Sequence, residues 1–301
     1  MARIDDLISE RIERIENIPD RFINKVAASQ DELFAELILI LEQLGLSRGS
    51  LQLNAQNLAL VDRLMEQYYQ VLRQSRYGRL VAGFIAELEK QKSLNDEIFN
   101  VEFDLSPGSQ SAAVFQSSRQ TALRQLIGDD FKTNFINVVR DQVIQSVEAK
   151  ASFKQLRDDL FGLFNDTEQR QGTIHNWVSQ ISRDIFSVTD RSYNNAVAEE
   201  LELEFGVYAG GLVRDSRPFC TSRAGNYYHI NEVRSWANLT DWKGRYRRTT
   251  ESNIIHWLGG YNCMHVFSFR SVRNVPPEVI QRNIANANYR PSLRERELLG
   301  I

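Results

Sequence analysis

The sequence predicts an α+β fold, in which a long and mainly helical N-terminal region precedes a small β-containing domain rich in Cys, His and Arg. Apolar residues recur at helical spacing through the first two hundred residues, and strand-like runs of aromatic and β-branched residues appear only after them. The charge changes at the same point. Residues 1–205 carry 22 Lys and Arg against 32 Asp and Glu, whereas residues 206–275 carry 10 against 4. We therefore predict an acidic helical region over 1–205, a small basic domain over 206–275 and a tail with a short helix over 276–301.

The composition is that of an ordinary folded chain. Of 301 residues, 42% are hydrophobic and 25% are charged, which excludes a disordered tract and a collagen-like fibre. Two cysteines are too few for a disulfide scaffold of this length, so we expect a reducing compartment. The acidic start does not resemble a signal peptide, and the longest aliphatic run, residues 37–41, is far shorter than the roughly 20 residues that span a bilayer. We expect no membrane partner.

The helices of the first region follow from apolar periodicity. A stripe over residues 4–18 predicts a first helix that Pro19 ends, and similar stripes predict helices over 31–44 and roughly 54–91. Residues 98–105 alternate between apolar and polar before a Ser-Pro-Gly turn, so we expect a short strand or an extended arm there.

Helical spacing then resumes and continues to the end of the region. We expect breaks near Gly128 and Gly162. The last helix is the most regular of all, with Asp166 or Thr167 as its N-cap and Gly206 in the position that follows a helix C-terminus.

The second region contains the predicted strands. Residues 207–213 and 266–272 are rich in aromatic and β-branched side chains. After Pro276 the tail predicts a short helix up to Ile284 and a final helical turn or two over 293–299.

Cysteine and histidine residues gather between these strands and form a candidate zinc site. Cys263 and His265 make a C-x-H pair, and Cys220 and His229 supply two more ligand types that zinc prefers. The alternative is that both cysteines are small buried hydrophobes and the histidines satisfy local hydrogen bonds. A disulfide between the two cysteines conflicts with the expected compartment. Zinc is the only cofactor that we predict.

No catalytic residue is predicted. The sequence contains no phosphate-binding loop, no H-E-x-x-H and no G-x-S-x-G, and no set of nucleophile, base and orienting group is visible. The Gly210-Gly211 and Gly259-Gly260 pairs lack the spacing of a dinucleotide site, and we expect them to serve turns or close backbone approach.

Basic and aromatic residues alternate in the same stretch. Positive charge releases counterions from phosphate and aromatic faces stack on bases, so the composition suits nucleic acid; arginine with aromatics is also typical of protein interfaces. A third interpretation is that this basic stretch packs on the acidic helices of its own or a neighbouring chain. The residues predicted to bind nucleic acid or a partner are Arg217, Arg223, Lys243, Arg245, Arg247 and Arg248.

Two short motifs occur in order within residues 191–272. A helix rich in Asn and Ala leads into the first strand and is followed by a turn that contains Asp215, Arg217, Pro218 and Cys220. A closing segment contains Gly259, Gly260, Asn262, Cys263 and His265. In these motifs the chain resembles the phage Mu F-like, or head morphogenesis, family of minor head proteins. It departs from the family pattern in lacking a second cysteine close to the first one and in having Met264 where Arg is frequent.

The resemblance implies a non-enzymatic minor head protein of a tailed phage. Such a protein would be assembled in the cytoplasm of the bacterial host and would lie in the virion head near the portal. Its expected partners are the portal protein or the major capsid protein and packaged double-stranded DNA, within a low-copy oligomeric assembly.

Two further hypotheses remain open. The first is a phage-associated nuclease or toxin, in which a helical carrier region precedes a catalytic domain that uses His229, His256, His265 and nearby arginines. The second is a plain nucleic-acid-binding domain unrelated to virions, with Arg245, Arg247 and Arg248 as its footprint.

Overall fold

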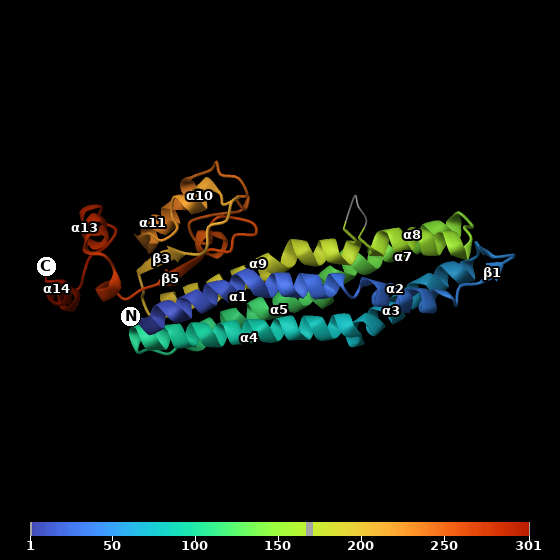
Figure 1. The fold of residues 1–301 in the computed structure, drawn as a ribbon, viewed down its shortest axis with the longest axis horizontal. Coiled ribbons are helices and arrows are strands. Elements are labelled where there is room, and N and C mark those ends of the chain that lie inside the picture. Colours follow the sequence, from blue (N-terminus) through green and yellow to red (C-terminus); the bar gives the residue numbers. More distant parts are fainter. Residues whose placement is uncertain (1, 167–170, 301) are drawn as a thin grey trace. The chain divides into compact units, whose positions relative to one another are not determined.

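The computed structural model describes residues 2–166 and 171–300 and is mainly helical, with small antiparallel sheets, as the α+β prediction requires (Figure 1). Contacts divide the chain into two compact units. The first unit comprises Met1–Asn17, Glu87–Arg119 and Arg183–Ile301, and the second comprises Ile18–Ala86 and Gln120–Ser182. This division differs from the predicted ranges 1–205, 206–275 and 276–301, because the first unit combines parts of the early helices with the whole C-terminal region.

The helices account for most of the described residues. Four of them contribute to both units: α1 (Ala2–Ala27), α4 (Arg76–Phe103), α5 (Ser109–Ile127) and α9 (Thr173–Glu200). The remaining elements of the second unit are α2 (Gln30–Leu41), the strands β1 (Leu46–Ser47) and β2 (Ser50–Leu51), α3 (Ala55–Gln74), α6 (Asp129–Phe131), a π-helical turn (Lys132–Ile136), α7 (Asn137–Glu148) and α8 (Phe153–Phe164). Aromatic rings fill the core of this unit, where Phe164 contacts the rings of Phe34, Tyr68 and Phe135.

A three-stranded antiparallel sheet organises the C-terminal part of the first unit. Its order is β4 (Tyr227–His229), β3 (Phe205–Ala209) and β5 (Val266–Phe269). Short helices follow the strands: α10 (Pro218–Thr221), α11 (Ile230–Ser235), a 3-10 turn (Trp236–Asn238), α12 (Ile254–Trp257), a 3-10 turn (Val272–Asn274), α13 (Pro277–Ala285) and α14 (Leu293–Leu299). β5 is buried along its whole length, so both of its faces are covered although it lies at an edge of the sheet.

The helical part of the first unit is joined by an apolar contact and an ion pair. Ile4 and Ile8 of α1 pack on Leu94 and Ile98 of α4. Three residues after Ile8 in α1, the fully buried Arg11 forms an ion pair with Asp190 of α9 at 2.6 Å. The carboxylate of Asp190 also accepts hydrogen bonds from the side-chain amides of Gln91 and Asn95 on α4. These contacts link α1, α4 and α9.

Several predicted boundaries in the first helices are wrong. Pro19 lies inside α1, because burial of Phe22 and Val26 in the following turns offsets the one backbone hydrogen bond that proline removes. The helix predicted over 54–91 is two helices. Ser75 takes an extended conformation after α3, and its hydroxyl accepts the amide of Tyr77 in the first turn of α4.

The segment predicted as a strand or arm over 98–105 is instead the end of α4. The buried residues Leu94 and Ile98 are four apart and Phe99 is buried beside them, a helical pattern that begins before the short alternation. A break does occur at Gly128, whereas Gly162 lies inside α8.

The boundaries of the last helix also differ. Thr167 lies outside the described residues. Asp166 lies before α9, and its carboxylate accepts the amide of Gly172 at 2.7 Å. α9 ends at Glu200, where the chain turns through a positive φ at Glu202, and Gly206 belongs to β3. A side chain at Gly206 would meet the ring of Phe267, which explains glycine at this strand position.

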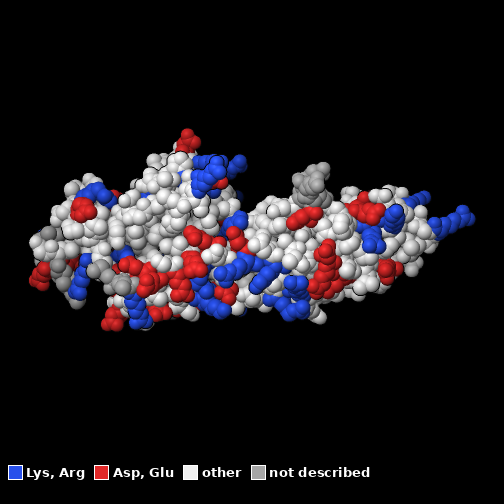
Figure 2. All heavy atoms as spheres, viewed as in Figure 1, with Lys and Arg blue, Asp and Glu red and all other residues white. Residues whose placement is uncertain are grey.

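The two predicted strands and the tail helices are confirmed with shifted ends, whereas β4 was not predicted. On the face drawn in Figure 2, acidic and basic side chains intermingle along the helices, and Lys and Arg also gather over the loops near α10. Within residues 2–166 and 171–300, no helix has both the length and the apolar character needed to cross a bilayer.

Candidate metal centre

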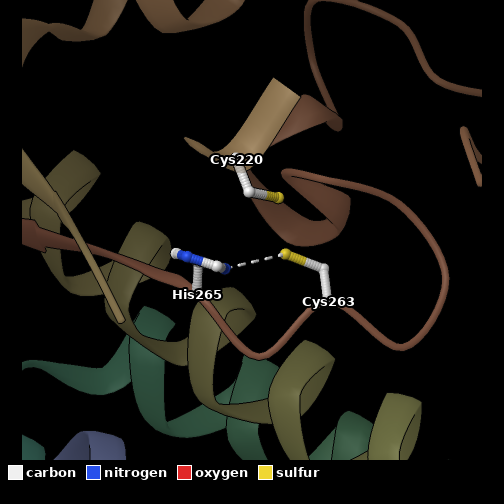
Figure 3. Close-up of side chains that lie close together, drawn as sticks. All are labelled: Cys220, Cys263 and His265. Carbon is white, nitrogen blue, oxygen red and sulfur yellow. Dashed lines mark hydrogen bonds between the residues drawn. The ribbon is translucent and has the colours of Figure 1, made fainter. Parts of the chain in front are cut away.

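Three of the four predicted zinc ligands meet in the first unit. Cys220 comes from α10, Cys263 from the loop before β5, and His265 from the residue immediately before β5. All three are buried, and one ligand atom from each lies within 4.8 Å of the other two. Their side chains point toward one another in Figure 3, where the dashed line joins Cys263 Sγ and His265 Nδ1 at 3.8 Å. We refer to these three residues as the Cys–His cluster.

Arg217 connects the two sequence motifs that carry the cluster. Pro218 begins α10, where a missing N–H has no cost, and Cys220 lies two residues later in the same helix. The guanidinium of Arg217 donates hydrogen bonds to the carbonyl oxygens of Gly259 at 2.8 Å and Tyr261 at 2.6 Å. The side chain of Arg217 in the first motif therefore binds backbone carbonyl groups of the second motif.

Two glycines allow this close approach. A Cβ atom at Gly259 would lie 2.4 Å from Cys220 Sγ and 2.9 Å from Cys263 Sγ. Gly260 has a φ of 91°, and a Cβ there would lie 1.9 Å from the carbonyl oxygen of Gly244. The glycine pair serves close backbone approach, as the sequence predicts.

Tyr208 is a neighbour of the cluster that sequence reasoning missed. It lies in the central strand β3 and is fully buried. Its hydroxyl donates to Cys220 Sγ at 3.4 Å and lies 3.8 Å from Cys263 Sγ, and its ring stacks on that of His265 with centroids 5.0 Å apart. An inward-facing tyrosine in a strand resembles any core tyrosine, so the sequence holds no signal for this role.

The electrostatic environment favours a thiolate in the cluster. The hydrogen bond from the Cys220 thiol lowers the pKa of Cys263, and the imidazole of His265 and the charge of Arg191 act in the same direction against desolvation. The pKa of Cys220 is raised, first by its hydrogen bond with Cys263 and then by burial. Arg191 is itself buried and donates to the carbonyl oxygens of Cys263 and His256. Thiolate sulfur and imidazole nitrogen are the ligands that zinc prefers.

His229, the fourth predicted ligand, is not part of the cluster. It is the N-cap of α11, where its Nδ1 accepts the amide of Asn231 at 3.1 Å and Glu232 accepts the amide of His229 in return. Its ring packs between Phe205 and Tyr289. A His followed three residues later by Glu is the spacing of a capping box, which is the signal that could have identified this role.

The histidines of the nuclease hypothesis occupy three different environments. His229 caps a helix, His265 belongs to the Cys–His cluster, and His256 lies with Nδ1 2.8 Å from the hydroxyl of Ser192. Burial and the charge of Arg191 lower the pKa of His256. Proximity in sequence therefore does not translate into one histidine site.

A small cavity of about 120 Å³ adjoins the cluster and is lined by all three of its residues. Three other motif residues, Asp215, Arg217 and Asn262, line the same cavity. Asn262 has a φ of 54° and donates its amide to the carboxylate of Asp184 at 2.7 Å. The motif residues Asp215, Arg217, Pro218, Cys220, Gly259, Gly260, Asn262, Cys263 and His265 thus surround one location.

The predicted basic binding residues divide into two groups. Arg217, Arg223 and Arg245 act inside the fold. Arg223 lies over the rings of Phe219 and Trp236, and burial lowers its pKa. Arg245 donates to the carbonyl oxygens of Ala237 and Thr249.

Lys243, Arg247 and Arg248 are exposed. Within the described part of the chain, no ion pair is found for their side chains. We call these three residues the exposed basic group, and they alone of the six predicted residues offer free charge at the surface.

Comparisons with known protein families, with curated proteins and with solved structures find no match to this chain.

Proposed function

We propose that the chain is a non-enzymatic minor head protein of a tailed phage, associated with the portal vertex and with packaged DNA. The observation that supports this proposal most directly is the meeting of the two motifs on which the family resemblance rests. Arg217 and Cys220 of the first motif contact Gly259 and Cys263 of the second across about forty residues of chain. The first motif follows β3 and the second precedes β5, and the antiparallel pairing of these strands makes one site of the two motifs.

Zinc is the metal that this proposal places at the Cys–His cluster. Two sulfurs and one imidazole nitrogen form a donor set typical of zinc, and their burial suits a structural rather than a solvent-exchanging site. A metal bound there would join α10, the loop before β5 and the start of β5. Because a preformed site rarely exists in the unfolded chain, metal binding would contribute directly to folding.

The exposed basic group supplies a surface for DNA or for an acidic partner. Lys243, Arg247 and Arg248 lie close together in sequence, and Tyr246 among them stacks on Trp257 with ring centroids 4.0 Å apart. Exposed charge next to anchored aromatic rings suits contact with phosphate.

Quantitative mass spectrometry of purified particles tests the proposal. A few copies per particle, present together with the portal protein, is the expected result. Detection of the protein only in the unassembled fraction of infected cells would contradict the head assignment. Incubation of the purified protein with DNA and RNA, with and without divalent metal, serves as the parallel test. Cleavage of either substrate would favour the nuclease hypothesis instead.

A further inference from the structure

The hydroxyl of Tyr208 occupies an unusual position. It is the polar end of a fully buried side chain, and the hydrogen-bond partners that the structure gives it are the sulfurs of Cys220 and Cys263. Thiol sulfur is a weak acceptor, whereas a buried tyrosine hydroxyl generally has a strong partner. A ligand at the cluster would supply that partner.

The distances around the cluster match those between the donors of one tetrahedral ion. With zinc bonds of about 2.3 Å to sulfur and about 2.0–2.1 Å to nitrogen or oxygen, neighbouring donors lie about 3.6 Å apart. The Tyr208 hydroxyl lies 3.4 Å and 3.8 Å from the two sulfurs. Cys263 Sγ lies 3.8 Å from His265 Nδ1. The hydroxyl therefore lies at donor spacing from both sulfurs of the cluster.

The backbone holds Tyr208 at this place. It pairs with Phe267 of β5 in the central strand, and its amide and carbonyl bond to residues 226 and 225 on the other side. Because both edges of the strand are paired, the hydroxyl is oriented before any metal arrives.

Binding of a metal would have to release the phenolic proton. Burial and the two neighbouring cysteines raise the pKa of Tyr208 well above its usual value of 10.0, so the hydroxyl keeps its proton in the metal-free protein. A divalent ion at the cluster would displace that proton, as it does from other ligands that it binds.

We propose that the phenolic oxygen of Tyr208 is the fourth ligand of a zinc ion held by Cys220, Cys263 and His265. This inference rests on the zinc site of the proposed function and adds the residue that closes it. Two other arrangements are conceivable from the same geometry. In one, Asp215 moves in from the rim of the cavity, and in the other the fourth position stays open to the cavity.

Cobalt(II) in place of zinc distinguishes these arrangements in the full-length protein. If Tyr208 closes the site, added thiocyanate leaves the visible spectrum of the wild-type cobalt protein unchanged. The variant Tyr208→Phe retains the ring but removes the donor. We expect its zinc affinity to fall about tenfold or more and its cobalt spectrum to respond to thiocyanate, because solvent takes the vacant position.

Tyr77→Phe is the matched control. Tyr77 is equally buried and its hydroxyl donates to the carbonyl oxygen of Leu126, so the variant loses a comparable hydrogen bond away from the cluster. Its zinc affinity should equal that of the wild type, and so should that of Asp215→Asn.

Three results would overturn the inference: a wild-type cobalt spectrum that shifts with thiocyanate, a Tyr208→Phe variant that binds zinc as the wild type does, or a tenfold loss in Asp215→Asn. The wild-type measurement decides the matter even if Tyr208→Phe does not fold. Failure of the wild-type protein to bind either metal would remove the zinc site as well, whereas the head assignment is judged separately by particle composition.

Discussion

At the scale of single residues, Gly259 shows how the cluster limits sequence choice. Gly259 does not have a positive φ, so its backbone conformation does not require glycine and the constraint at this position is space alone. A Cβ atom at this position would contact both sulfurs and would lie 3.4 Å from the hydroxyl oxygen of Tyr208. Any side chain would displace the donor atoms that the fold has brought together.

We expect Gly259→Ala to lower zinc affinity about tenfold or more and to reduce thermal stability, because a methyl group at 2.4 Å from Cys220 Sγ separates the donors. Zinc titration with a competing chromophoric chelator and a thermal melt measure both effects. Gly83→Ala is the control, since no atom lies within 4 Å of a Cβ there and alanine favours the helix. Equal zinc affinity in the two variants would show that the donors tolerate displacement.

The arginines of the C-terminal region show what residue type alone can predict. The sequence identifies a charged residue but not whether its side chain points into the fold or toward solvent. The prediction therefore groups Arg217, Arg223 and Arg245 with residues that reach solvent. Each of the three binds carbonyl oxygens or lies on an aromatic ring, and the contacts of Arg217 join residues more than 40 positions apart. Likewise, the residue types of Cys220, Cys263 and His265 predict a group that could hold a metal, and the structure brings the three together. The presence of Tyr208 rather than His229 beside them depends on strand pairing.

At the scale of elements, the buried pair Arg11–Asp190 joins α1 to α9. Burial opposes ionisation of Asp190, but the charge of Arg11 and hydrogen bonds from Arg11, Asn95 and Gln91 lower its pKa below the usual value of 3.8. Loss of one partner leaves the other as an uncompensated buried charge.

Asp190→Asn is therefore expected to lower the free energy of unfolding by about 3–5 kcal/mol, because it leaves the Arg11 guanidinium buried without a counter-charge. Urea denaturation at neutral pH measures the loss. The double variant Arg11→Met with Asp190→Leu should recover much of it, since no charge is then buried. A double variant no more stable than the single one would show that packing rather than charge is at fault.

The lowered pKa of Asp190 also predicts a pH dependence. A carboxyl whose folded pKa is depressed contributes stability above its unfolded pKa, and that contribution is lost as pH falls through the folded value. Stability from this pair should therefore persist down to about pH 4 and decline below it. Urea midpoints of the wild type and the double variant between pH 6 and pH 3 test this: the wild type should lose stability relative to the double variant only at the acidic end.

Helix identity was predictable from periodicity, whereas helix ends were not. Periodicity reflects one buried helix face, and the spacing of the apolar residues on that face can be read directly from the sequence. The break at Ser75 depends on a single hydroxyl that caps α4, and the continuation past Pro19 depends on burial of later residues. β4 is only three residues long, so its identity comes from pairing with β3 rather than from its own pattern.

At the scale of the whole molecule, folding directs some of the positive charge of the basic C-terminal region into the interior and leaves the rest exposed. The arginines used inside the fold leave Lys243, Arg247 and Arg248 as the predicted binding residues that remain exposed. The exposed part of the predicted basic binding set is accordingly smaller than the composition indicates.

Reversal of these three charges to Glu is expected to abolish most DNA retention and to leave thermal stability unchanged. If all three touch phosphates, the slope of log affinity against log salt should fall by about 3. Arg245→Glu should show the opposite pattern, with a lower melting temperature, because its guanidinium holds Ala237 and Thr249. Electrophoretic mobility shifts over a salt series and parallel melts separate the two. Unchanged DNA affinity in the triple variant would exclude this surface.

The composition of the first unit from three separate stretches of chain has a consequence for the order in which the protein folds. The partner of Arg11 lies 179 residues later in the chain, so the buried contact of α1 forms only after α9 is in place. The second unit, by contrast, ends at residue 182. Closing long loops delays the contacts that depend on them. In pulsed hydrogen exchange during refolding, we expect α2, α3 and α7 to become protected before the first turns of α1. Simultaneous protection of both would show that the units fold as one.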